Sequence, residues 1–168
     1  MTTYELKIKN LTSPTFDGIR NIAIGQLHAQ FAQQQIQKMH NKLKRGAVVI
    51  DQEELLWSYL LSFGKMHQAK IYEALNRIPN ISDVVCDEYT IIDWGCGQGL
   101  ATVCMFDFLH IKRVYNAPKK VIFIEPSEMA IKKAFLYTNL YDVDNIVLVN
   151  KSIDKVDVND ISTDTPIT

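Results

Sequence analysis

The sequence predicts an α/β fold in which a helical N-terminal region precedes a partial parallel sheet of about three strands. Three short runs, at 91–94, 121–124 and 146–149, consist mainly of apolar residues. Segments in which apolar residues recur at helical spacing separate these runs. Strands that are apolar on both faces are typical of parallel sheets, because helices cover both sides of such a sheet. The order therefore predicts two strand–helix–strand units with right-handed crossovers.

The size and composition of the chain indicate a globular protein. Its 168 residues suffice for one domain with a core, and 47% are hydrophobic and 22% charged. No apolar run approaches the ~20 residues that a membrane span needs, and the N-terminus lacks the layout of a signal peptide. We therefore expect a cytoplasmic protein. Cys86, Cys96 and Cys104 have neither redox-pair nor zinc-ligand spacing, so no metal site is predicted.

Residues 1–80 form the predicted helical region. A short run at 4–8 alternates apolar and charged residues, which predicts a strand, and residues 16–45 then have the pattern of one long helix. A second helix begins near Asp51, which with Glu54 has the acidic form of a capping box. The apolar residues of this second helix, Leu56 and Tyr59 among them, form a stripe at helical spacing that we interpret as core packing.

Residues 81–168 form the predicted sheet region. The strand at 91–94 leads through a glycine-rich turn into a helix at about 100–109. After the strand at 121–124, a second helix begins at Pro126-Ser127, and the strand at 146–149 follows. This order predicts a Rossmann-like half-domain that holds a cofactor and is truncated before a fourth strand.

The glycine-rich turn is the most informative motif. Gly95 allows a tight turn from strand to helix, while Gly97 and Gly99 have no side chain to keep a ligand away from the backbone. The following helix directs unpaired N–H groups and its positive dipole end toward the turn. Asp93 places a carboxyl group in the same crevice, which argues against a pyrophosphate and favours a ligand with a cationic group.

A second acidic residue follows the next strand. Glu125 lies 28 residues after Gly97, at the carboxyl end of the strand 121–124. An acid at this position can accept hydrogen bonds from both ribose hydroxyls of an adenosine. Pro126 makes the following turn rigid and is a candidate wall for the adenine. Together the two segments predict a site for a nucleoside cofactor.

The glycine spacing separates the candidate cofactors. A dinucleotide loop reads G-x-G-x-x-G, and Leu100 stands where its third glycine would fall. A phosphate-binding P-loop needs a lysine after its last glycine, and none follows here. Neither motif fits well.

The segment Asp93-Trp94-Gly95-Cys96-Gly97-Gln98-Gly99 resembles the first motif of the class I S-adenosylmethionine-dependent methyltransferases, and 121–127 resembles their second motif. The resemblance covers roughly residues 85–155. It implies that Gly95 and Gly97 line the methionine portion of the cofactor, that Asp93 lies near its amino group, and that Glu125 holds the ribose. The helical region is more loosely similar to bacterial methyltransferases related to a ribosome-assembly group.

The predicted site consists of cofactor-binding residues only. We leave the catalytic residues unassigned, and the spacing does not rank three candidates near the adenine amino group, which are Asn150, Ser152 and Asp154. The predicted cofactor-binding residues are Asp93, Gly95, Cys96, Gly97, Gly99, Glu125 and Pro126.

The resemblance also implies seven strands, of which the sequence holds about three. Without a fourth strand, the strand at 91–94 has an open apolar edge. We expect that the chain is a fragment. The alternatives are that this edge pairs with another chain in an oligomer, or that the N-terminal helices cover it.

The predicted function is that of an S-adenosylmethionine-dependent methyltransferase, a transferase, or of the cofactor-binding portion of one. The alternatives are a non-catalytic binding or assembly module and, less favoured, an NAD(P)-dependent oxidoreductase. The methyl acceptor is open. Basic residues from Lys38 to Arg45 allow RNA or a ribosomal partner, although cations near a helix end also favour the helix dipole whatever the function.

Overall fold

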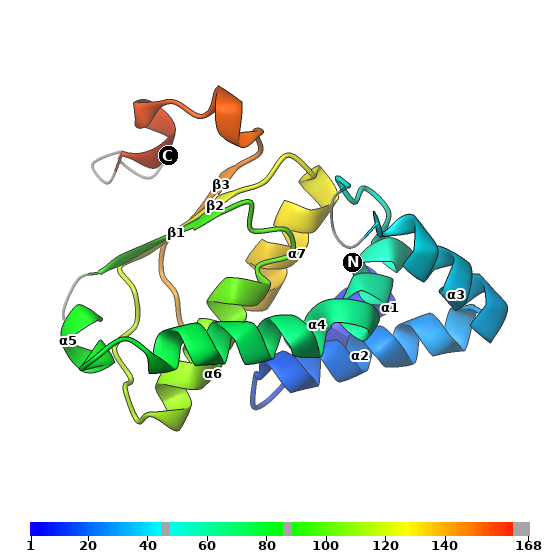
Figure 1. Cartoon of the computed structure of the whole chain (residues 1–168), viewed down its shortest axis with the longest axis horizontal. Coiled ribbons are helices and arrows are strands. Elements are labelled where there is room, and N and C mark those ends of the chain that lie inside the picture. Colours follow the sequence, from blue (N-terminus) through cyan, green and yellow to red (C-terminus); the bar gives the residue numbers. More distant parts are fainter. Residues whose placement is uncertain (45–47, 86–88, 163–168) are drawn as a thin grey trace.

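The computed structural model, which describes residues 1–44, 48–85 and 89–162, has a helical region and a three-stranded parallel sheet with helices between its strands (Figure 1). This is the predicted partial Rossmann-like α/β fold. In chain order the elements are α1 (Thr3–Lys9), α2 (Phe16–Gln30), α3 (Gln33–Lys42), α4 (Glu53–Asn76), α5 (Ile81–Val84), β1 (Thr90–Trp94), α6 (Leu100–Ile111), β2 (Lys120–Ile124), α7 (Glu128–Thr138), β3 (Ile146–Val149), η2 (Ile153–Lys155) and η3 (Val158–Ile161).

The sheet has the strand order β1-β2-β3, and all pairs are parallel. Asp93 pairs with Phe123 and Trp94 with Ile124, so the carboxyl ends of β1 and β2 lie side by side. Within the described residues β1 is an edge strand. Trp94 at its end is about half exposed.

Each face of the sheet is covered by a different part of the chain. Val121 and Phe123 pack with Ile131 and Ala134 of α7. The alternate residues of β2 pack instead against the C-terminal segment that contains η2 and η3, on the far side of the sheet from the helices (Figure 1). Every residue of β2 is buried as a result, which explains the wholly apolar run from 121 to 124.

The segment at 4–8 is a helix, so the predicted strand is wrong. Tyr4 and Ile8 are both buried, whereas Leu6 is exposed. A spacing of four residues places two side chains on one helical face, so this short alternation also fits a helix. A capping box between Thr2 and Glu5 decides the outcome, because each satisfies a backbone N–H of the other.

The long helix predicted over 16–45 is interrupted, and the described part of it forms α2 and α3. Phe31 adopts an extended backbone conformation, and the Gln35 side chain accepts a hydrogen bond from the Ala32 N–H at 2.9 Å. The break turns α3 back so that it packs on α4. The predicted Asp51–Glu54 capping box is also wrong, because the N-cap of α4 is Gln52.

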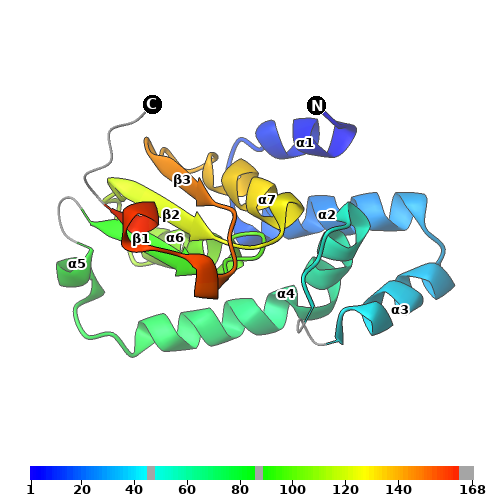
Figure 2. The same cartoon turned by 90° about the horizontal axis from the view of Figure 1, so that it is seen from above.

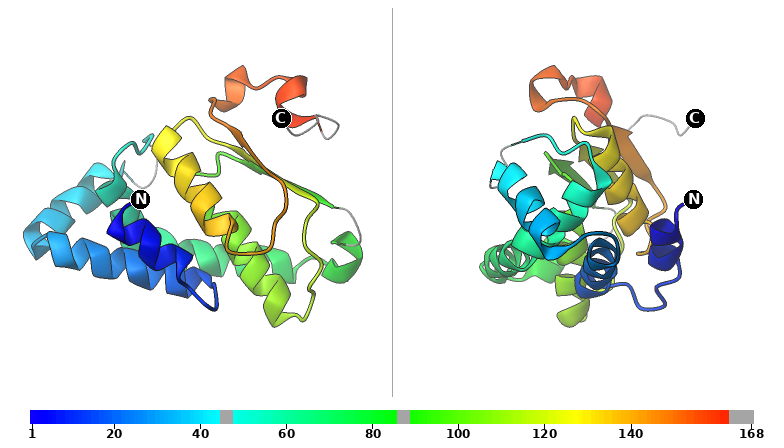
Figure 3. Two further views of the ribbon diagram at one scale, coloured as in Figure 1. Left: turned by 180° about the vertical axis from the view of Figure 1, so that it is seen from behind. Right: turned by 90° about the vertical axis from the view of Figure 1, so that its right-hand side faces the viewer.

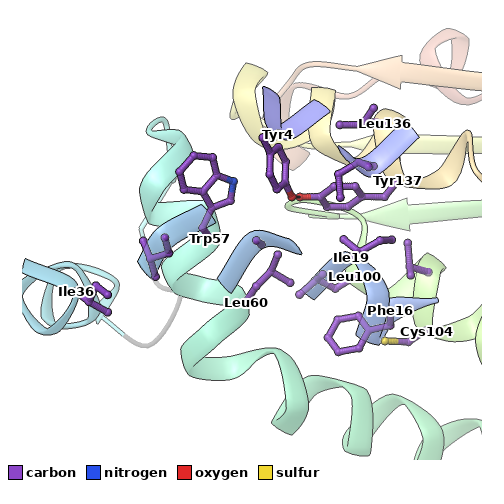
Figure 4. Packing of buried hydrophobic residues seen from close by; sticks show 14 residues of the cluster. Tyr4, Phe16, Ile19, Ile36, Trp57, Leu60, Leu100, Cys104, Leu136 and Tyr137 are labelled. Atoms are coloured by element: carbon purple, nitrogen blue, oxygen red, sulfur yellow. Dashed lines mark hydrogen bonds between the residues drawn. The ribbon is translucent and has the colours of Figure 1, made fainter. Parts of the chain in front are cut away.

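Helix α4 joins the helical region to the sheet region. It runs along one side of the molecule, with α2 and α3 at one end and α5 at the other (Figure 2), and it packs on α2, α3 and α6. From behind, α1 lies next to α7 (Figure 3). The largest hydrophobic cluster accordingly contains residues from both sides of position 80, such as Phe16 and Leu60 with Cys104 and Tyr137 (Figure 4). Within the described residues, no helix combines the length and apolar character needed to cross a bilayer.

Candidate functional site

The turn after β1 has the conformation that its glycines predict. Gly95, Gly97 and Gly99 have φ values of +64°, +53° and +74°, all in the left-handed region that favours glycine. The Cys96 N–H donates to the Ile124 carbonyl at 3.1 Å, so the turn stays bonded to the end of β2. The turn therefore begins beside β2 and leads directly into α6.

Glu125 joins the two predicted motifs. Its Oε2 accepts a hydrogen bond from the Gly97 N–H at 2.9 Å, and its Oε1 accepts one from the Ser127 N–H at the same distance. The residue is 8% exposed. Segments that are 28 residues apart in the sequence thus meet through one carboxyl group, whose remaining lone pairs can still accept hydrogen bonds from a ligand.

Asp93 lies at the carboxyl end of β1, facing α6. The Thr102 hydroxyl donates to its Oδ2 at 2.7 Å. Burial raises the pKa of Asp93 above its usual value, the hydrogen bonds from Thr102 oppose this shift, and the charge of Glu125 adds to it. A cation bound beside Asp93 would stabilise the charged form of the carboxyl group and lower this pKa.

A cleft of about 330 Å³ lies between this turn and α4. Residues 93–98 and Glu125 form part of its lining. The opposite wall consists of the α4 side chains Leu56, Tyr59, His67 and Ile71, together with Val48 and Ile50 from the segment before α4. The helical region is therefore part of the candidate site.

The α4 wall was missed by sequence reasoning, which treated the stripe containing Leu56 and Tyr59 as core packing. Part of this stripe does pack in the core, where Leu60 is fully buried. His67 belongs to no recognisable sequence motif, and it is not one of the apolar residues that define the stripe. Only the placement of α4 across from the glycine turn identifies these residues.

The remaining predicted residues have different surroundings. Cys96 lines the cleft, and burial together with the charges of Asp93 and Glu125 raises the pKa of its thiol. Gly99 is absent from the cleft lining, and a Cβ there would lie 3.0 Å from Ala134 Cα, so Gly99 permits close packing of the turn on α7. Pro126 is exposed and also lies outside the lining.

The three residues predicted as candidates for the adenine amino group lie in different positions. Asn150 Nδ2 donates to the carbonyls of Glu125 and Pro126 at 2.8 and 3.0 Å, so it holds the end of β2. Ser152 is the N-cap of η2, and Asp154 is exposed within it. None of the three lines the cleft.

Buried hydrogen bonds attach the glycine turn to three helices. The Gln98 side chain donates from Nε2 to the Leu56 carbonyl of α4 at 3.0 Å, and its Oε1 accepts from the Tyr137 hydroxyl at 3.4 Å. The Tyr137 hydroxyl is in turn 2.6 Å from that of Tyr4 in α1 (Figure 4). Because these atoms are buried, breaking one bond leaves a partner unsatisfied. The helices therefore hold the turn in place.

Within the described ranges, no group of three or more His, Cys, Asp or Glu side chains has an arrangement suited to a metal ion. Of the predicted basic residues, Lys38 and Lys42 are exposed on α3, and Arg45 lies outside the described residues. Comparisons of the chain with models of protein families, with curated proteins and with solved structures found no match.

Proposed function

We propose that the cleft binds S-adenosylmethionine and that the chain is a methyltransferase, or the cofactor-binding portion of one. The observation that carries the proposal is the hydrogen bond from the Gly97 N–H to the Glu125 carboxyl. This bond places Gly97, where an added Cβ would meet nothing within 4 Å, next to Glu125. The Glu125 carboxyl group can accept hydrogen bonds from ribose hydroxyls. The methyl acceptor is unassigned, and RNA is one class that the basic residues of α3 allow.

The charges around the cleft favour this cofactor over a pyrophosphate-containing one. Asp93 and Glu125 both line the cleft, and no Lys or Arg is among its described lining residues. A dinucleotide would bring two phosphate charges toward these carboxyl groups, whereas S-adenosylmethionine brings a sulfonium, an ammonium and one carboxylate, and so a net positive charge. Leu100, at the position of a third dinucleotide glycine, is buried in the core cluster.

Calorimetric titration with S-adenosylhomocysteine tests the proposal. We expect the 168-residue chain to bind this ligand, and Glu125→Ala to weaken binding by about tenfold or more, because each hydrogen bond to a charged group contributes roughly 1.5–3 kcal/mol. Glu128→Ala is the matched control, since Glu128 is exposed and pairs only with Lys132 among the described residues. Glu125→Gln separates the effects of charge and of shape, because its amide oxygen can still accept one backbone N–H.

Two results would contradict the proposal. One is absence of binding at millimolar ligand by a folded chain, and the other is unchanged affinity in Glu125→Ala. A fluorescence titration with NADH runs in parallel, and tight NADH binding would favour the oxidoreductase instead. Binding of the methyl donor without transfer to any acceptor would favour a non-catalytic module.

A further inference from the structure

Two side chains of α4 form a stacked pair at the wall of the cleft. The hydroxyl of Tyr59 and Nε2 of His67 are 2.8 Å apart, and the two rings lie nearly parallel, with centroids separated by 5.6 Å and an interplanar angle of 16°. Tyr59 also packs against Phe63, with ring centroids 5.3 Å apart. Tyr59 and His67 thus contact each other and line the same cleft as the glycine turn.

We propose that this Tyr59–His67 pair is the wall against which the cationic sulfonium end of the methyl donor lies, so that α4 distinguishes the charged donor from its neutral product. The inference rests on the proposed function, because it assigns a role within the same cleft. It makes the helical region a determinant of ligand specificity as well as a support.

The chemistry of the pair suits a cation. The face of a tyrosine ring attracts a positive charge within about 6 Å of its centroid, and contact with a desolvated cation is the stronger case. Such a contact would use the face of Tyr59 that is not stacked on His67. S-Adenosylmethionine has such a charge at sulfur, whereas S-adenosylhomocysteine has an uncharged thioether, lacks the methyl group on sulfur and has the same adenosine and amino-acid parts. A wall that contacts the sulfur should therefore favour the donor over the product, while a wall that contacts the adenosine should treat both equally.

The protonation state of His67 is consistent with this role. Burial lowers the pKa of His67, and the nearby charge of Lys70 lowers it further. The imidazole is therefore neutral at neutral pH and does not repel a cation. Among the described residues that line the cleft, the other titratable side chains are those of Tyr59, Asp93, Cys96 and Glu125, from α4, β1, the glycine turn and the end of β2.

The first test compares the two ligands in leucine variants of two α4 tyrosines. We expect Tyr59→Leu to weaken binding of S-adenosylmethionine by about threefold to thirtyfold and to change the affinity for S-adenosylhomocysteine much less. Tyr72→Leu is the matched control, because Tyr72 packs on Phe108 and is absent from the cleft lining. Tyr59→Phe keeps the aromatic ring, should retain the preference for the donor, and stays informative if the leucine variant unfolds.

The second test uses pH. Acidification from about pH 8 to about pH 5 raises the protonated fraction of His67, whose lowered pKa places this change below that of a free imidazole, and the resulting charge repels the sulfonium but not the thioether. We expect the ratio of the two affinities to shift against S-adenosylmethionine by on the order of fivefold in the wild-type chain. In His67→Gln, which retains a polar partner for Tyr59, this shift should disappear. Any effect of Asp93 or Glu125 should remain in that variant.

The outcomes separate this inference from the proposed function. If the wild-type chain binds both ligands but Tyr59→Leu weakens them equally, or weakens neither, the inference is wrong and the proposed function stands. The same holds if the affinity ratio shifts with pH alike in wild type and His67→Gln. If the folded wild-type chain binds neither ligand, both proposals are wrong.

Discussion

At the scale of single residues, the glycine turn contains positions with different physical roles. Gly97 and Gly99 both have positive φ. Replacing either glycine with a residue that has a side chain therefore strains the backbone at that position. A Cβ at Gly97 would meet nothing within 4 Å, whereas a Cβ at Gly99 would lie 3.0 Å from both Cα and Cβ of Ala134. Gly97 therefore keeps space open at the cleft, and Gly99 allows the turn to pack on α7.

Alanine substitutions should separate these roles. Each variant loses roughly 1–2 kcal/mol of stability from left-handed backbone strain, and Gly99→Ala should lose about 1–3 kcal/mol more from the steric conflict with Ala134. Gly97→Ala should instead show the larger loss of S-adenosylhomocysteine affinity relative to its loss of stability. Equilibrium urea unfolding and calorimetry measure the two effects.

A glycine in a regular helix provides the control. Nothing lies within 4 Å of a Cβ added at Gly25 of α2, so Gly25→Ala should raise stability by up to about 1 kcal/mol. Equal losses of stability in Gly97→Ala and Gly99→Ala would contradict the assignment of Gly99 to packing.

At the scale of secondary-structure elements, a buried lysine connects α1, α4 and α7. Lys133 Nζ is 2.5 Å from Glu53 Oε1 and 3.6 Å from Glu5 Oε1, and it lies 4.9 Å from the centroid of the Tyr4 ring. The lysine side chain is 7% exposed, whereas the two glutamates are 26% and 32% exposed. The lysine is thus the member of this group that depends most on its partners.

Removing the charge of Glu53 should destabilise the protein more than removing the charge of Lys133. Glu53→Gln removes the nearer carboxylate charge and leaves Lys133 buried with its longer contact to Glu5 and its contact with the Tyr4 ring, and we expect a loss of about 3 kcal/mol in the free energy of unfolding. Lys133→Met removes the buried charge and leaves carboxyl groups that water can reach, so its loss should be about 1 kcal/mol or less. Chemical unfolding measures both, and Lys132→Met, at an exposed pair with Glu128, should change stability little. A larger loss in Lys133→Met than in Glu53→Gln would contradict this account.

At the scale of the whole molecule, the two sequence regions share one hydrophobic cluster. Helix α4 packs on α2 from the first region and on α6 from the second. Trp57 belongs to this cluster, while Trp94 is exposed at the end of β1. These are the only two tryptophans in the chain. Their fluorescence therefore reports on unfolding on the two sides of the boundary that we predicted at residue 80.

We expect both sides to unfold together. Fluorescence of the single-tryptophan variants Trp57→Phe and Trp94→Phe, followed in urea, should give one transition with the same midpoint after correction for the stability change of each variant. Coincidence of the two probes is the standard test of cooperative unfolding. Two separate midpoints would instead mean that the regions fold as independent domains.

Much of the fold could be predicted because its signals are local. The apolar runs identify β1, β2 and β3, and the glycines identify the turn between β1 and α6. The errors arose where local signals were ambiguous. The alternation at 4–8 fits a helix as well as a strand. The break at Phe31 depends on a capping hydrogen bond from the Ala32 N–H to the Gln35 side chain, together with the packing of α3 on α4.

The candidate site divides in the same way. By itself the sequence determined that Asp93, the glycine turn and Glu125 follow the carboxyl ends of neighbouring parallel strands. The limits of the strands and the turn chemistry depend on nearby residues, and consecutive parallel strands usually lie side by side. Only the tertiary structure decided that the Glu125 carboxyl bonds to the Gly97 N–H and that Tyr59 and His67 face the same cleft. The physical reason is that the face a helix presents to a cleft depends on packing between segments far apart in the chain, and no local pattern at residues 59–67 records where β1 and β2 end.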